Sequence, residues 1–84
     1  MTDKILKMSA SWCQPCKALT MTLLNEDIGA PVESVDIDEN PTLAAQYGIR
    51  TVPTMIYTRD GVEVARLTGN QPLGKIVQWV ADQK

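Results

Sequence analysis

Cys13 and Cys16 are the only two cysteines of the 84-residue chain, and two residues separate them. Thiol-disulfide exchange needs one thiolate that attacks a disulfide and a second thiol close enough to displace the mixed disulfide that results. A structural disulfide contributes more stability as the loop that it closes lengthens, so a bridge across two residues contributes little. The spacing therefore favours a bond that is made and broken over one that holds the fold together.

The residues around the pair predict different roles for the two sulfurs. Apolar residues recur at helical spacing from Cys13 to about Asn25, which places Cys13 at the N-terminus of a helix. Unpaired N–H groups and the helix dipole favour a thiolate there, with a pKa below the roughly 8.5 of a free thiol. Pro15 suits the first turn of the helix, and Gln14 can reach solvent. The helix turns Cys16 inward, so we expect Cys13 to be the exposed attacking group and Cys16 the resolving thiol.

A metal half-site is an alternative use of two cysteines at this spacing. Tetrahedral Zn²⁺ takes four ligands, and the chain has no histidine and no third cysteine, which disfavours a zinc site within one chain. A cluster shared between two copies and a buried pair without function stay open. We predict no metal and no cofactor other than the redox-active Cys13–Cys16 disulfide.

The elements that must position the pair alternate between strand and helix. Hydrophobic patterning and turn residues predict strands and helices in the order β-α-β-α-β-β-α. The expected strands are Lys4–Met8, Val32–Ile37, Thr54–Thr58 and Val62–Thr68, and the expected helices are 13–25, 41–47 and Gln71–Asp82. Asp60-Gly61 predicts an antiparallel hairpin between the last two strands. We expect one α/β domain over residues 1–84, with a four-stranded mixed sheet and helices on both faces.

Composition and charge exclude several classes of function. The net charge is −2 and no basic run occurs, which argues against binding of nucleic-acid phosphates. No segment approaches the roughly 20 apolar residues that span a bilayer, and no signal peptide is evident at the start of the sequence. We therefore expect a cytoplasmic monomer that binds neither nucleic acid nor membranes.

Three separated motifs give the chain a family resemblance. The segment around the cysteines, Ser11-Trp12-Cys13-Gln14-Pro15-Cys16-Lys17, resembles the active-site segment of thioredoxins, with Gln14 in place of the usual glycine. Residues 35–41 and 47–54 resemble the strand, short helix and cis-proline loop of that family, in the same order. The strand and helix that open a full-length thioredoxin have no counterpart here. That shorter arrangement of elements, and the loop sequence Thr51-Val52-Pro53, also resemble glutaredoxins.

The resemblance implies a substrate site around the disulfide. It implies that Pro53 is cis and lies against the sulfurs, and that the backbone of Val52 pairs with an extended substrate peptide; an ordinary trans turn is the alternative. Gly69 falls where a glycine lets a partner backbone approach, although it also suits a simple turn. Trp12 offers an exposed apolar contact for partners, whereas Trp79 suits packing.

Lys7 departs from the family pattern. Thioredoxins carry a buried aspartate at this place, and the lysine expected on the next strand is Ser34 here. A lysine ammonium close to the cysteines lowers their pKa, whereas one that extends into solvent does not. The substitution also leaves no obvious general base for the resolving thiol.

The resemblance implies a reductase of protein disulfides that is regenerated by an upstream donor. That donor is a reductase of the thioredoxin-reductase type or glutathione. A glutathione-dependent glutaredoxin and a dimeric iron-sulfur-binding module are the alternative functions.

Overall fold

The computed structural model describes residues 2–84, and its elements follow the predicted order. The four strands are β1 (Asp3–Ser9), β2 (Val32–Asp36), β3 (Thr54–Arg59) and β4 (Val62–Thr68). The three helices are α1 (Gln14–Leu23), α2 (Pro41–Gln46) and α3 (Leu73–Asp82). None of the helices in the described part is long and apolar enough to cross a membrane.

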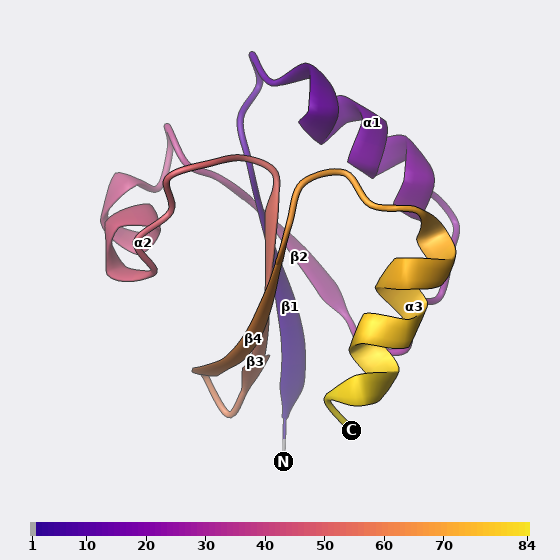
Figure 1. The fold of residues 1–84 in the computed structure, drawn as a ribbon. Coiled ribbons are helices and arrows are strands. Elements are labelled where there is room, and N and C mark those ends of the chain that lie inside the picture. The colour runs from indigo at the N-terminus through magenta and orange to yellow at the C-terminus, as the bar shows by residue number, and fades with distance from the viewer. Residues whose placement is uncertain (1) are drawn as a thin grey trace.

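The strands form one mixed sheet in the order β2-β1-β3-β4. β1 pairs with β2 in parallel and with β3 antiparallel, and β3 pairs with β4 antiparallel. Figure 1 shows α1 and α3 on one face of this sheet and α2 on the other. The predicted four-stranded sheet with helices on both faces is therefore confirmed.

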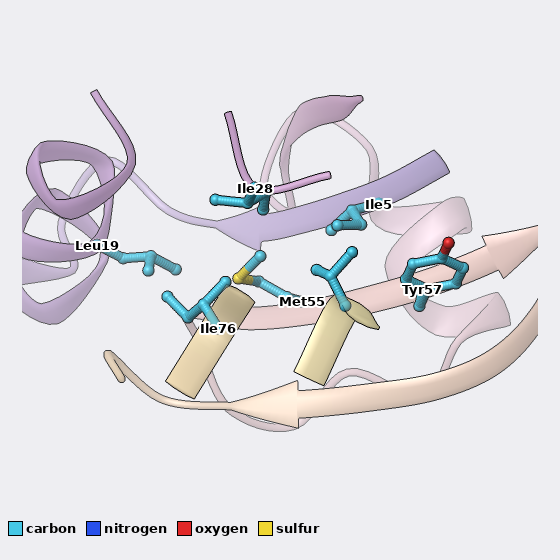
Figure 2. Packing of buried hydrophobic residues seen from close by; sticks show 7 residues of the cluster. Ile5, Leu19, Ile28, Met55, Tyr57 and Ile76 are labelled. Atoms are coloured by element: carbon cyan, nitrogen blue, oxygen red, sulfur yellow. The ribbon is translucent and has the colours of Figure 1, made fainter. Parts of the chain in front are cut away.

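Two apolar layers hold the helices to the sheet because successive residues of β1 point to opposite faces. Ile5 belongs to the layer beneath α1 and α3, which contains Leu19, Ile76 and Tyr57 (Figure 2). The other layer lies beneath α2, and its buried members are Leu6, Met8, Val35 and Ile56. α1 is thus fixed along its inner face to the middle of the sheet.

Every element except β4 differs from its predicted bounds by one or two residues, most clearly β1, α1 and α3. β1 is longer at both ends, since Asp3 pairs with Arg59 and Ser9 with Asp36. α1 ends at Leu23 and not near Asn25, because its C-cap Leu24 is already extended (φ −61°, ψ 123°), and Asn25 follows with a left-handed φ of 61°. α3 begins at Leu73 because the extended Pro72 is its N-cap.

The loops that carry the chemistry gather at one end of the sheet. Figure 1 shows the start of α1, the loop before β3 and the loop after β4 at this end, with both termini at the opposite end. The turn between β3 and β4 lies away from them and has the predicted Asp60-Gly61 pair, with φ of 54° and 83°. The fold therefore brings two loops that are far apart in sequence, those before β3 and after β4, toward the cysteines.

Candidate active site

Cys13 and Cys16 form a disulfide at the start of α1, with their Cα atoms 5.2 Å apart. Cys13 is the N-cap, with extended backbone (φ −95°, ψ 111°), and Pro15 occupies the first turn. A proline is accommodated there because its missing N–H would have no partner within the helix. The sequence thus builds the pair into the helix terminus itself.

The backbone N–H of Cys16 points at the other sulfur and lies 3.2 Å from Cys13 Sγ. This sulfur takes the place of the oxygen that Ser or Asp offers at other helix N-termini. In the reduced protein the same N–H, together with the positive end of the α1 dipole, would stabilise a Cys13 thiolate.

Both cysteines are buried, with 4% of Cys13 and 3% of Cys16 exposed. The prediction of an exposed Cys13 is therefore wrong for this disulfide form. The pair packs with Ala10 and is covered by Ile37 and Val52, which belong to loops that helical periodicity does not reveal. Gln14 and Pro15 are exposed, as expected of the tip of the turn.

The loop before β3 lies directly against the disulfide. The Val52–Pro53 bond is cis, so the alternative of a trans turn is wrong. Cys13 Sγ lies 3.6 Å from the carbonyl oxygen of Val52, and Pro53 is fully buried beside it. Val52 itself is half-buried.

Gly69 joins the same cluster through its backbone. Its N–H donates to the carbonyl oxygen of Pro53 at 2.8 Å, and its φ of 86° lies in the left-handed region. Glycine adopts that region without steric cost, so the residue type suits the loop. Whether a partner backbone approaches Gly69 stays a prediction.

An open groove of about 270 Å³ begins beside Val52 and Trp12. Trp12 is 65% exposed, and its indole N–H donates to the Asp38 carboxylate at 2.9 Å. The groove is lined by apolar side chains and by one cation; its residues are Trp12, Ile37, Ile49, Arg50, Thr51 and Val52. Sequence reasoning missed Asp38, Ile49 and Arg50 because only the fold brings them beside the motif.

Lys7 lies in the middle of β1 and is only 7% exposed, so it does not extend into solvent. Its Nζ donates to Thr20 Oγ1 at 2.9 Å, and the Thr20 hydroxyl donates to the carbonyl oxygen of Cys16 at 3.1 Å. Burial lowers the pKa of Lys7, because desolvation penalises the charged form. Thr20 was not predicted as a site residue, and no local signal marks it.

Trp79 packs edge-on against Tyr57 as expected, with ring centroids 6.0 Å apart.

Similarity to known proteins identifies the family of the chain. The family model described as Thioredoxin matches residues 2–82. A thioredoxin of Chlamydia caviae is 37% identical over 81 residues, which cover 90% of this chain and 78% of that protein.

Solved structures agree with this assignment. A mutant thioredoxin from Halobacterium salinarum has a TM-score of 0.81 at 31% identity and covers 95% of this chain and 73% of its own. Fasciola hepatica thioredoxin has a TM-score of 0.83 at 28% identity and covers 99% and 82%. With the disulfide at the N-terminus of α1 and the cis-proline loop against it, the chain belongs to the thioredoxin family and is a protein thiol-disulfide oxidoreductase.

Proposed function

We propose that the chain reduces disulfides of other proteins, with Cys13 as the attacking thiolate and Cys16 as the resolving thiol. The observation that carries this assignment is the hydrogen bond from the Cys16 N–H to Cys13 Sγ at the N-cap of α1. It gives Cys13 the backbone donor that stabilises negative charge. Cys16 lies within the first turn of α1 and its sulfur reaches Cys13, which suits the resolving role.

The first half of the reaction joins enzyme and substrate. The Cys13 thiolate attacks one sulfur of the substrate disulfide, that disulfide breaks, and its second sulfur leaves as a thiolate that takes up a proton. The product is a mixed disulfide between Cys13 and the substrate. Opening of the buried pair on reduction is required, because only 4% of Cys13 is exposed in the disulfide form.

The second half releases the substrate. Cys16 loses its proton and attacks Cys13 Sγ, which breaks the mixed disulfide and frees the remaining substrate thiol. The Cys13–Cys16 disulfide returns, and two electrons have passed to the substrate. A donor dithiol of a protein of the thioredoxin-reductase type then reduces the Cys13–Cys16 disulfide and is itself oxidised to a disulfide. This regeneration takes place in a reducing compartment such as the cytoplasm.

Substrate binding in this proposal uses the surface around the sulfurs. The backbone of Val52 pairs with an extended peptide, and Pro53 and Gly69 form the floor on which it lies. Trp12, which lines the same groove as Val52, and the exposed tip, Gln14 and Pro15, supply further contacts. The contact from Trp12 is held in place by its hydrogen bond to Asp38.

The test supplies the oxidised protein with two electron sources in separate assays. One contains NADPH and thioredoxin reductase, the other NADPH, glutathione and glutathione reductase, and each includes insulin as a disulfide substrate. Consumption of NADPH with the first source, lost in Cys13→Ser, is the expected result. Turnover with glutathione alone would instead identify a glutaredoxin activity.

The purified protein also tests the binding-module alternative. A colourless monomer by light scattering is expected, since the proposal needs neither metal nor a second copy. A brown dimer that exchanges no disulfides would show that the two cysteines hold an iron-sulfur cluster.

A further inference from the structure

Lys7 has an unusual environment for a charged residue. It lies on the face of β1 beneath α1, in register with Ser34 of β2 and Met55 of β3. The Lys7 side chain is therefore flanked in the sheet by one neutral polar and one apolar neighbour. Its neighbour two residues before, Ile5, belongs to the apolar layer under α1 and α3.

No carboxylate neutralises this cation among residues 2–84, where the ion pairs involve Lys4, Arg59 and Arg66 instead. Glu26 and Asp27, which follow α1, line the same hollow of about 440 Å³ as Lys7 but form no ion pair with it. A buried charge without an ion-pair partner is costly, so its retention calls for a compensating use.

The Lys7 ammonium is linked to the backbone of Cys16 through one residue. Thr20 lies one helical turn after Cys16, and its hydroxyl accepts from Lys7 Nζ at 2.9 Å while donating to the Cys16 carbonyl at 3.1 Å. Thr20 is itself at the exposed side of α1, so it fixes the amino group at the edge of the buried layer. Lys7 is thereby linked to the backbone of Cys16 through two consecutive hydrogen bonds.

We propose that Lys7 and Thr20 are positioning residues that favour the thiolate form of Cys16 over the thiol and so stabilise the reduced dithiol. This inference rests on the proposed function, and it assigns to that site a charge of the opposite sign to the family's buried aspartate. Reduction of the disulfide takes two electrons from the donor dithiol and leaves two sulfurs to be protonated. A cation linked to the Cys16 backbone through Thr20 favours the charged form of the Cys16 sulfur, so one of these protons is more easily given up.

The test compares the wild-type protein with Lys7→Met and Thr20→Val. Methionine keeps the length of the side chain without its charge, and valine keeps the shape of threonine without its hydroxyl. Lys75→Met, at an exposed position on α3, removes one lysine that takes no part in the Lys7–Thr20–Cys16 contacts and is the matched control. Circular dichroism confirms that each variant is folded before it is compared.

Two readouts separate a charge effect from a loss of packing. The first is the ultraviolet absorbance of thiolates against pH in the reduced proteins, where Lys7→Met is expected to raise one midpoint by about one pH unit. The second is the equilibrium with reduced and oxidised glutathione above that midpoint. Lys7→Met is expected to shift this equilibrium about tenfold toward the disulfide, which corresponds to a reduction potential about 30 mV more negative.

Thr20→Val is expected to shift both readouts in the same direction as Lys7→Met but by a smaller amount. Lys75→Met is expected to shift neither readout. Unchanged readouts in Lys7→Met would overturn the proposal, and unchanged readouts in Thr20→Val would overturn the role of its hydroxyl. The outcome is independent of the insulin assay. A wild-type protein that reduces no insulin but shows the lysine-dependent titration would contradict the proposed function and leave this inference standing.

Discussion

At the scale of single residues, the site differs from an ordinary helix terminus in one atom. A sulfur stands where an oxygen usually accepts the free N–H groups of the first turn, and Cys16 N–H donates to it at 3.2 Å. Ionisation of Cys13 is thereby coupled to the helix that carries Cys16. The proposed roles of the two sulfurs rest on this geometry and on Val52, whose carbonyl oxygen lies 3.6 Å from Cys13 Sγ.

That division predicts opposite results for the two serine variants. Cys16→Ser should still attack a protein disulfide but should accumulate as a mixed disulfide, since no second thiol resolves it. Cys13→Ser should form no such adduct, because the remaining thiol lies within α1. Non-reducing gels after incubation with a disulfide-containing protein measure the adduct. Equal trapping by both variants would show that the sulfurs are interchangeable.

At the scale of elements, α1 is fixed to the sheet chiefly by Leu19, which is fully buried one turn after the disulfide. Leu19→Ala should lower the free energy of unfolding by about 2 to 5 kcal/mol through lost burial and a cavity. Met21 lies on the same helix but is 67% exposed, so Met21→Ala should change stability by less than about 0.5 kcal/mol. Urea unfolding of the oxidised proteins provides both values, and comparable losses would contradict this account of α1.

Two glycines give a matched test of backbone conformation. Gly61 in the β3–β4 turn has a φ of 83°, whereas Gly74 lies in α3, and an added Cβ would meet no atom within 4 Å at either position. Gly61→Ala should therefore destabilise by about 1 kcal/mol through left-handed strain alone. Gly74→Ala should stabilise by up to about 1 kcal/mol, because alanine loses less entropy in a helix. Thermal unfolding measures both, and equal signs would refute the assigned cause.

The difference between local and long-range signals explains how much of this could be predicted from sequence. The Cys13–Cys16 turn, the Asp60-Gly61 hairpin and the alternation of strands and helices depend on neighbouring residues, and the structure confirms them. The burial of Cys13 depends on loops that arrive from elsewhere, so its predicted exposure was wrong. The hydrogen bonds from Trp12 to Asp38 and from Lys7 to Thr20 depend on how helices and strands pack against one another. No pattern along the chain marks them.

At the scale of the whole molecule, one polar cluster ties together the end opposite the disulfide. The Asp3 carboxylate on β1 accepts from Arg59 Nε at 3.0 Å and from the Tyr57 hydroxyl, both on β3. Arg59 Nη2 also donates to the carbonyl oxygen of Gln83, the C-cap of α3. The first strand, the centre of the sheet and the last helix thus share one ion pair.

This cluster makes stability depend on acid in a definite direction. Hydrogen bonds from Arg59 and from Tyr57 lower the pKa of Asp3 from 3.8 to about 2. Because the folded pKa lies below the unfolded one, the contribution is fully present above about pH 4 and is lost as the pH falls toward 2. Asp3→Asn removes the titrating group and should therefore abolish this part of the acid sensitivity.

The expected result is that Asp3→Asn is less stable than wild type at pH 7 and that the difference shrinks between pH 4 and pH 2. Urea unfolding at pH 7, 4, 3 and 2 measures it, with Glu39→Gln, an exposed carboxylate outside the cluster, as the control. A constant difference in the free energy of unfolding between Asp3→Asn and wild type at all four pH values would mean that Asp3 acts through packing and not through its charge. Since the cluster lies at the end of the sheet opposite the cysteines, its loss should leave the rate of disulfide exchange at pH 7 unchanged while the fold persists.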